Sequence, residues 1–342
     1  MRVAFVGGGT GGHLTPAIGI AEELQCRGHQ VEFWLSGRLV EQNYIADDFT
    51  HRSLGIDQSS LPRQLAMFPA AMRLRKYCGQ FNPHILVSLG GYAGAAALAS
   101  PRRTLVCLEG NAVVGKSVKY LSRFAEQVLV MFKETAASLP RSTVVGPISR
   151  SSTRQPSREE ACLKFGLDPS RPVLLTMGGS QGAASLNGCV LKMLPEIVDA
   201  GWQLLALTGA NKSAELRRAV ENCGASAAVL EHCADMGAAY ACADFMLSRG
   251  GASTLAEVWL NTTPTMVMPY LHKDMQQHLN AELLSPGVQL FDGSELSRKQ
   301  LLHNLNDSEA REAMRSALSN KPVADGKKIA CDTLEEIAAR KS

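Results

Sequence analysis

The sequence has no paired cysteines and no long apolar run. Its nine cysteines form no Cys-x-x-Cys pair and no cluster with histidine at zinc-ligand spacing. We therefore expect reduced thiols, and neither a disulfide framework nor a cysteine-held metal. No apolar run of about 20 residues occurs, so no membrane-spanning helix is expected. The first residues lead into a strand pattern rather than a cationic and apolar leader, so we expect no signal peptide.

Charge is also sparse. Charged residues make up 20% of the chain and hydrophobic residues 45%, the composition of a packed globular protein. The 342 residues favour two domains, because a single core seldom grows beyond about 250 residues. Residues 1–150 carry 16 Lys and Arg against 10 Asp and Glu, and residues 151–342 carry 19 against 22. The net charges of +6 and −3 favour a basic first half that meets an anionic surface or substrate, although chance also produces such differences.

Short apolar runs alternate with helical spacing along both halves. Strands are predicted at residues 3–6, 31–35, 84–89, 104–108, 128–131 and 143–145, and again at 173–177, 203–208, 228–230, 245–248 and 265–268. This alternation predicts an α/β fold of two doubly wound domains with parallel sheets, residues 1–150 and residues 151–342. The polar stretch between Gly146 and Pro172 is the expected linker.

Two helices have recognisable features. Thr15 and Pro16 predict an N-cap and a first helical residue, and this helix should continue to about Arg27. The final helix, at about residues 325–342, is amphipathic between Ile329 and Arg340. It could pack on either domain, including back on the N-terminal one.

Each half begins with a glycine-rich turn between a strand and a helix. The two strings are Gly7-Gly8-Gly9-Thr10-Gly11-Gly12-His13 and Gly178-Gly179-Ser180-Gln181-Gly182-Ala183. Glycines allow the backbone to approach a phosphate, and the following helix offers free N–H groups. The alternative is a tight turn without a ligand.

Two other nucleotide sites compete with this interpretation. Gly7, Gly9 and Gly12 fit a dinucleotide fingerprint, but the second strand ends in Ser36-Gly37 without the acidic residue that would hold a ribose. The string from Gly110 to Ser117 fits the P-loop pattern, which predicts a nucleoside triphosphatase. No apolar strand ends in the Asp that would hold magnesium.

Several motifs resemble those of one family. They are Gly8-Gly9-Thr10-Gly11-Gly12-His13, Gly90-Gly91-Tyr92, Gly178-Gly179-Ser180-Gln181-Gly182-Ala183, Ser248-Arg249-Gly250-Gly251-Ala252, Thr254, Glu257, His272-Lys273-Asp274, Gln276-Gln277 and Asn280-Ala281. In this order and spacing they resemble the MurG family, the peptidoglycan N-acetylglucosaminyltransferases that convert lipid I to lipid II. The resemblance spans residues 1 to about 290.

The resemblance implies the GT-B architecture, two Rossmann-like domains facing a cleft, with the UDP-sugar donor held mainly by the second. The implied donor residues are Thr10, Gly11, Gly12, Asn111, Arg150, Ser180, Gln181, Gly182, Cys233, Ser253, Thr254, Glu257, Gln276 and Gln277. Gly90, Gly91 and Tyr92 are implied on the acceptor side. Ser180 would bind the pyrophosphate and Glu257 the ribose hydroxyls, whereas Gln276 and Gln277 would read sugar hydroxyls. Glu257 could instead be part of a solvated helix face, and the glutamines a polar helix start.

His13 is the implied catalytic residue. Its imidazole could take the proton of the acceptor hydroxyl as that hydroxyl attacks the sugar. Alternatively, His13 only shapes the loop. The implied reaction is a single inverting displacement in which UDP leaves against backbone amides, without a metal or other cofactor, and no Asp-x-Asp motif is present.

The implied acceptor is a polyprenyl-pyrophosphate-linked sugar at the inner face of the cytoplasmic membrane, and no nucleic acid is expected. Residues 61–81 mix apolar and basic residues, which suits either an anionic lipid surface or an ordinary surface helix. The chain departs from the family at Leu108-Glu109-Gly110-Asn111 and at Ala93-Gly94-Ala95. A GT-B transferase with another lipid acceptor, or a sugar-nucleotide-binding protein without turnover, therefore stay as alternatives.

Overall fold

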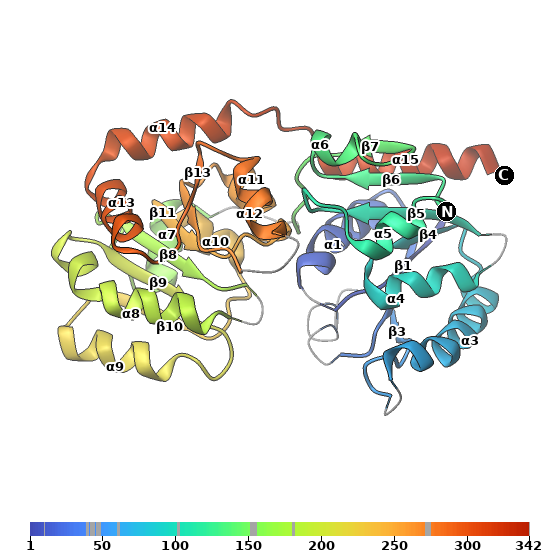
Figure 1. The fold of residues 1–342 in the computed structure, drawn as a ribbon, viewed down its shortest axis with the longest axis horizontal. Coiled ribbons are helices and arrows are strands. Elements are labelled where there is room, and N and C mark those ends of the chain that lie inside the picture. Colours follow the sequence, from blue (N-terminus) through green and yellow to red (C-terminus); the bar gives the residue numbers. More distant parts are fainter. Residues whose placement is uncertain are drawn as a thin grey trace. The chain divides into compact units, whose positions relative to one another are not determined.

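The computed structural model describes residues 1–9, 11–38, 41, 45, 49–59, 62–100, 103–150, 156–179, 182–270 and 275–341. The chain divides into two compact units (Figure 1). Unit 1 consists of Met1–Ser151 and Val323–Ser342, and unit 2 of Ser152–Pro322. The last segment of the chain therefore belongs to unit 1.

Unit 1 contains a seven-stranded parallel sheet in the order β3-β2-β1-β4-β5-β6-β7. The strands are β1 Arg2–Val6, β2 Gln30–Leu35, β3 His51–Ser53, β4 Ile85–Ser88, β5 Thr104–Glu109, β6 Gln127–Val130 and β7 Ser142–Val144. The helices of unit 1 are α1 Gly11–Cys26, α3 Arg63–Phe81, α4 Gly91–Ala95, η1 Ala96–Ala99, α5 Lys116–Leu121, α6 Lys133–Ala136 and α15 Gly326–Lys341.

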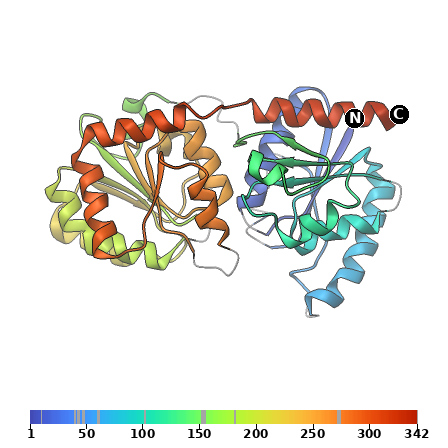
Figure 2. The same cartoon turned by 45° about the horizontal axis from the view of Figure 1, so that its top comes forward.

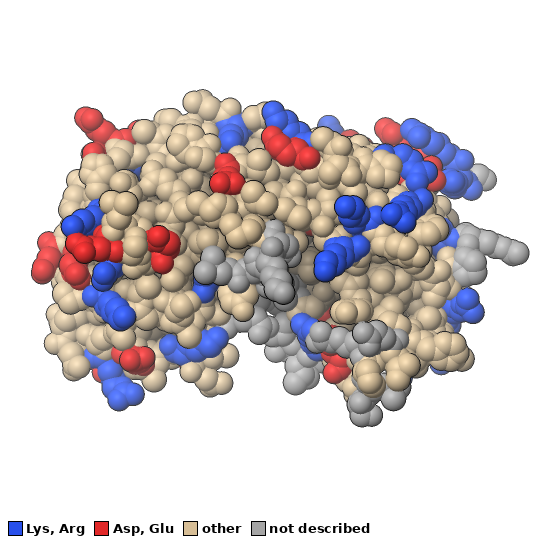
Figure 3. All heavy atoms as spheres, in the orientation of Figure 1, with Lys and Arg blue, Asp and Glu red and all other residues tan. Residues whose placement is uncertain are grey.

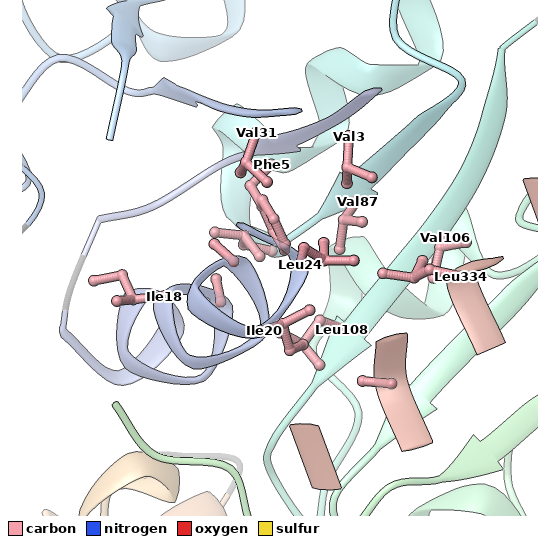
Figure 4. Packing of buried hydrophobic residues seen from close by; sticks show 14 of the residues in the cluster. Val3, Phe5, Ile18, Ile20, Leu24, Val31, Val87, Val106, Leu108 and Leu334 are labelled. Carbon is pink, nitrogen blue, oxygen red and sulfur yellow. The ribbon is translucent and has the colours of Figure 1, made fainter. Parts of the chain in front are cut away.

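Both faces of this sheet are covered, as its apolar strands require. Successive side chains of a strand point to opposite faces. Val3 and Phe5 of β1 pack in the cluster that contains α1 and α15 (Figure 4). Ala4 and Val6 instead pack with α3. Leu334 of α15 is fully buried in the first cluster, so the last helix completes one face of unit 1.

Unit 2 contains a six-stranded parallel sheet in the order β10-β9-β8-β11-β12-β13. Figure 2 shows helices packed around this sheet. Its strands are β8 Val173–Met177, β9 Gln203–Leu207, β10 Ala227–Leu230, β11 Phe245–Ser248, β12 Thr265–Val267 and β13 Val288–Leu290. Its helices are α7 Arg158–Lys164, α8 Ala184–Asp199, α9 Ala214–Cys223, α10 Met236–Cys242, α11 Ala252–Asn261, α12 Gln276–Glu282, α13 Glu295–Asn306 and α14 Ser308–Ser319.

One sequence-based expectation, the start of the first helix, is wrong. Helix α1 begins at Gly11 rather than at Pro16, so Pro16 lies inside the helix and the amide it lacks is one that would have bonded to Gly12. The boundary between the two units, after Ser151, lies inside the expected linker, and the second part of that stretch contains α7, which begins with a capping box. In this box Ser157 and Glu160 each accept a hydrogen bond from the other's backbone amide, at 3.2 and 2.8 Å.

Candidate functional site

Both glycine turns lie where the strand order of their sheet reverses. In unit 1, β1 lies between β2 and β4, and in unit 2, β8 lies between β9 and β11. Open α/β sheets bind ligands at the carboxyl ends of strands at such switch points. The loops that follow β1 and β4, and those that follow β8 and β11, are therefore the candidate half-sites, one in each unit.

The first glycine turn is supported by buried polar groups. Gly8 has a φ of +151°, and a Cβ atom there would lie 2.5 Å from Oε1 of Glu41. The Glu41 carboxylate is fully buried and accepts a hydrogen bond from the Ser36 hydroxyl at 2.7 Å. Nη1 of Arg38 donates to the Gly9 carbonyl at 2.9 Å. These contacts define the path of the backbone that leads to α1.

His13 lies in the first turn of α1 together with Gly11 and Gly12, whereas Thr10 lies outside the described residues. Nδ1 of His13 is buried and has no hydrogen-bond partner among the described residues. A buried polar atom of this kind is uncommon and calls for a functional or structural reason. The site therefore combines an imidazole with the glycine turn, as the sequence predicts.

The glycines predicted on the acceptor side, Gly90 and Gly91, follow β4 and lie beside the first glycine turn. A Cβ atom on Gly7 would lie 3.2 Å from the Gly90 carbonyl oxygen. The Gly91 amide donates to Oγ of Ser117 at 2.8 Å, which links this loop to the start of α5. Tyr92 is 53% exposed. The structure thus brings the three loops after β1, β4 and β5 together.

The loop that fits the P-loop pattern is organised around its own carboxylate. Glu109, which ends β5 and is only 4% exposed, accepts hydrogen bonds from the Asn111 amide (3.0 Å) and side chain (2.9 Å). Its other oxygen accepts one from the Gly115 amide at 2.8 Å. A carboxylate thus takes up amides that a P-loop offers to phosphate, and its charge would repel a phosphate. The triphosphatase interpretation therefore has no support in this loop.

The second glycine turn presses against the neighbouring strand. Gly182 has a φ of +65°, and a Cβ atom there would overlap the Thr208 carbonyl oxygen at the end of β9. The Gly182 amide donates to the Gly179 carbonyl at 2.9 Å, which closes the turn. Ser180 and Gln181, two of the predicted donor residues, lie outside the described residues.

Two helices at the switch point of unit 2 begin without a side-chain cap. Neither Ala183, which precedes α8, nor Gly251, which precedes α11, makes a side-chain cap hydrogen bond. Elsewhere in unit 2, Asp235 and Ser294 cap α10 and α13, whereas α9 and α12 also begin without a side-chain cap. The uncapped amides at the N-termini of α8 and α11, together with the positive ends of these helices, provide a place for an anion.

The turn before α11 is held by α12. Oε1 of Gln277 accepts hydrogen bonds from the amides of Gly250 (3.3 Å) and Tyr270 (2.9 Å). Nδ2 of the buried Asn280 donates to the Gly250 carbonyl at 3.0 Å. The side-chain carbonyl of Gln277 therefore already accepts hydrogen bonds from two backbone amides, which the sequence did not indicate. Gln276 is the first residue of α12.

Arg249 joins the same turn to α8. Its Nη2 donates to Oγ of Ser185 at 2.6 Å and its Nη1 to the Met268 carbonyl at 2.7 Å. Desolvation lowers the pKa of Arg249 from its usual value. Arg249 thus connects the start of α8 with the loop after β12.

Three predicted donor residues lie on α11 itself. Ser253 and Thr254 are in its first turn, and Thr254 is buried. Glu257 lies one turn further and keeps part of its side chain exposed. Desolvation raises the pKa of Glu257 to about 7, and a hydrogen bond from the Tyr240 hydroxyl (3.2 Å) opposes that rise. Sequence reasoning missed Tyr240, because a single tyrosine on a helix carries no motif.

The remaining predicted residues lie further along each unit. Cys233 follows β10, and its Sγ donates to the Asp235 carbonyl at 3.2 Å. Burial raises the pKa of the Cys233 thiol. Arg150 belongs to unit 1, where its Nε lies 3.8 Å from Oε1 of Glu22. Within the described ranges, no three His, Cys, Asp or Glu side chains are grouped so that they could hold a metal ion.

Comparison with known proteins defines the class. The crystal structure of MurG from Acinetobacter baumannii has the same fold, with a TM-score of 0.75 and 22% identity over 98% of this chain and 99% of that one. The architecture of two Rossmann-like units is therefore that of the GT-B glycosyltransferases. Models of the N-terminal and C-terminal domains of glycosyltransferase family 28 match residues 3–130 and 173–329. The chain belongs to glycosyltransferase family 28 and is a glycosyltransferase.

Similar curated proteins share one activity name. A UDP-N-acetylglucosamine–N-acetylmuramyl-(pentapeptide) pyrophosphoryl-undecaprenol N-acetylglucosamine transferase from Chlorobium phaeobacteroides is 35% identical, over 93% of this chain and 94% of its own length. A protein of the same name from Chlorobaculum tepidum is 33% identical over 93% and 94%. The similarity therefore extends through both units.

Proposed function

We propose that this protein transfers N-acetylglucosamine from its UDP donor to undecaprenyl-pyrophosphoryl-N-acetylmuramyl-pentapeptide (lipid I), which gives lipid II in peptidoglycan synthesis. The observation that carries the proposal is the 35% identity to a transferase of this name over nearly the whole chain. A match that included only the sugar-nucleotide unit would support the donor and leave the acceptor undefined. Here the similarity includes the unit that carries His13 and Gly90-Gly91-Tyr92 as well.

Unit 2 supplies the groups that a UDP-sugar needs. The uncapped N-termini of α8 and α11 suit the pyrophosphate, with Gly182 shortly before α8. The Glu257 carboxylate suits the two ribose hydroxyls. Donor contacts by Ser180, Gln181, Cys233, Ser253, Thr254 and Gln276 belong to the same proposal. Gln277 offers a ligand its side-chain NH₂ group, since its side-chain carbonyl accepts hydrogen bonds from the amides of Gly250 and Tyr270.

Unit 1 supplies the acceptor side. His13 acts as general base and takes the proton of the acceptor hydroxyl as its oxygen attacks the anomeric carbon, with inversion. Gly90, Gly91 and Tyr92 line the acceptor loop. UDP departs against backbone amides rather than against a metal, so chelation of divalent cations should leave the rate unchanged.

The acceptor is a lipid, and unit 1 has an apolar surface that suits a membrane. Leu65, Phe68 and Met72 of α3 are 60%, 75% and 61% exposed and follow helical spacing along one face. Helix α3 contacts α4, which contacts α5, where Tyr120 is 52% exposed. The exposed Lys116, Lys119 and Arg123 lie on or just after α5, and Figure 3 shows basic side chains gathered over that part of unit 1.

We therefore place this surface on the inner face of the cytoplasmic membrane, bound through apolar side chains and anionic lipid headgroups. No helix of the described residues combines the length and the apolarity needed to cross a bilayer.

Phe68→Glu should reduce sedimentation with anionic vesicles by about tenfold, since it replaces an apolar side chain that would enter the membrane with a negative charge that anionic lipids repel. The matched control is Leu296→Glu in unit 2, whose side chain is 79% exposed. Equal loss in both variants would contradict the assignment.

The decisive experiment measures transfer of labelled N-acetylglucosamine from its UDP donor to a soluble lipid I analogue. ATP hydrolysis and the effect of a chelator are followed in the same samples. Transfer without ATP loss and without sensitivity to the chelator supports the proposal. UDP-sugar binding without transfer would favour another acceptor or a protein without turnover.

His13→Ala should lower the turnover rate much more than the donor affinity. An unchanged turnover rate would show that His13 has only a structural role.

A further inference from the structure

A buried tyrosine, Tyr240, contacts the carboxylate of Glu257, the proposed ribose-binding residue. Tyr240 lies on α10, is 5% exposed, and donates its hydroxyl hydrogen bond to Oε2 of Glu257 on α11 at 3.2 Å. Among the described residues, the structure records no other hydrogen bond to this carboxylate. One oxygen is thus tied to α10, and the partly exposed side chain keeps lone pairs for a ligand.

The Tyr240 hydroxyl donates this hydrogen bond whenever Glu257 is ionised. Burial, and then the neighbouring charge of Glu257, raise the pKa of Tyr240 well above its ordinary value, so the hydroxyl keeps its proton at neutral and mildly alkaline pH. A phenol held by a packed helix has only its ring rotation to adjust. Glu257 is therefore held at a defined orientation before any ligand arrives.

We propose that Tyr240 is a positioning residue that orients the Glu257 carboxylate toward the two neighbouring hydroxyls of a ribose. The site then selects ribonucleoside diphosphate sugars over their 2′-deoxy counterparts. This inference rests on the proposed function, because it assumes that Glu257 receives the ribose. A preoriented carboxylate accepts both hydroxyls at once, whereas a freely rotating one must first be ordered.

The protonation state of Glu257 should make the donor affinity depend on pH. The ionised carboxylate can accept two hydroxyl hydrogen bonds, but the protonated form gives up part of that capacity. With a pKa of about 7, Glu257 changes state near neutrality, so donor affinity should rise as the pH increases through that value. The Tyr240 hydrogen bond favours the ionised form, so its loss should move the rise to higher pH.

The test uses the full-length protein and calorimetric titration with UDP-N-acetylglucosamine, whose phosphates do not titrate near neutrality. Tyr240→Phe should weaken binding by about threefold to tenfold at pH 7 and shift its pH midpoint upward. It should also reduce the ratio of UDP to 2′-deoxy-UDP affinity at pH 8. Glu257→Gln should bind weakly with a flat pH profile. Tyr77→Phe is the matched control, because it removes a partly buried tyrosine hydroxyl that donates to the Ser53 carbonyl in unit 1.

The outcomes separate this inference from the proposed function. If the wild-type protein binds no UDP-sugar, the proposed function fails. If it binds, and Tyr240→Phe keeps the wild-type pH midpoint and ribose preference, Tyr240 has no positioning role, whatever happens to stability. A lower melting temperature with both signatures unchanged would assign Tyr240 to packing alone and overturn the proposal.

Discussion

Glu257 has an ionisable side chain where burial opposes its charge. Its pKa, raised to about 7 from 4.5, means that the folded protein holds the proton more tightly than the unfolded chain. The stability that this proton provides is complete below pH 4.5 and is lost as the pH rises through about 7. At higher pH the folded protein contains a charged, desolvated carboxylate, which lowers its free energy of unfolding. Ligand-binding sites often carry such a loss of stability.

We therefore expect Glu257→Gln to stabilise the protein at pH 8 by about 3 kcal/mol, since glutamine cannot ionise. Near pH 4.5 the two proteins should have equal stability. Urea unfolding at both pH values measures the difference. A variant that is equally stable at pH 8, or less stable, would show that the charged carboxylate is not strained in the free protein.

Gly182 is a second residue whose identity the backbone dictates. Its positive φ and the close approach of the Thr208 carbonyl oxygen leave no room for a side chain. Gly182→Ala should destabilise the protein by about 3 kcal/mol, because two packed backbone segments must separate. Gly188→Ala in α8 is the control, since nothing lies within 4 Å of a Cβ there and alanine favours a helix. Similar melting temperatures for both variants would contradict this view.

At the same scale, the sequence identifies candidate residues but not their contacts. The glycine strings could be named in advance because turns are local, whereas Glu257 and His13 are named from the family resemblance and their roles stay predictions. The Glu109 bonds that close the P-loop-like string, and the Tyr240 hydroxyl behind Glu257, depend on chain reversals that a linear pattern does not contain. Gln277 shows the same limit, since its bond to Gly250 joins residues 27 positions apart.

Among the elements, buried strands were the most predictable. The predicted limits of β8 and β11 are confirmed to the residue, because both are continuous apolar runs in the middle of a parallel sheet. The short edge strands β3 and β13 were missed. Strand β3 reads His51-Arg52-Ser53, and pairing on one side only requires no apolar pattern.

Helix α15 is an element whose partner the sequence left open. It packs against α1, and Arg27, which directly follows α1, donates to Asp332 (2.6 Å) and Glu335 (3.0 Å) of α15. Leu334→Ala should destabilise unit 1 by about 3 kcal/mol, because it leaves a cavity in a closed core. The exposed Arg340→Ala in the same helix is the control. Hydrogen exchange in β1 reports the loss, and unchanged exchange there would show that α15 is not part of that core.

At the scale of the whole molecule, the two units have separate cores, and we propose that unit 2 binds the donor and unit 1 the acceptor. A donor that binds unit 2 should protect the amides of β8 and β11 from hydrogen exchange and leave those of β1 and β4 nearly unchanged. At a concentration of about 100 times the dissociation constant, binding stabilises the bound unit by about 2.7 kcal/mol. Equal protection of both units would show that donor binding and the folding of unit 1 are coupled.

The crossing of α15 back to unit 1 has a consequence for protein synthesis. The strands of unit 1 leave the ribosome first, but Leu334 and Ile337, which close one face of their sheet, are translated after all of unit 2. Unit 2 can complete its core during translation, because its residues are continuous in the chain. Unit 1 must wait until α15 emerges with part of this apolar face covered only by α1, and over that interval it is the part of the nascent chain most in need of a chaperone.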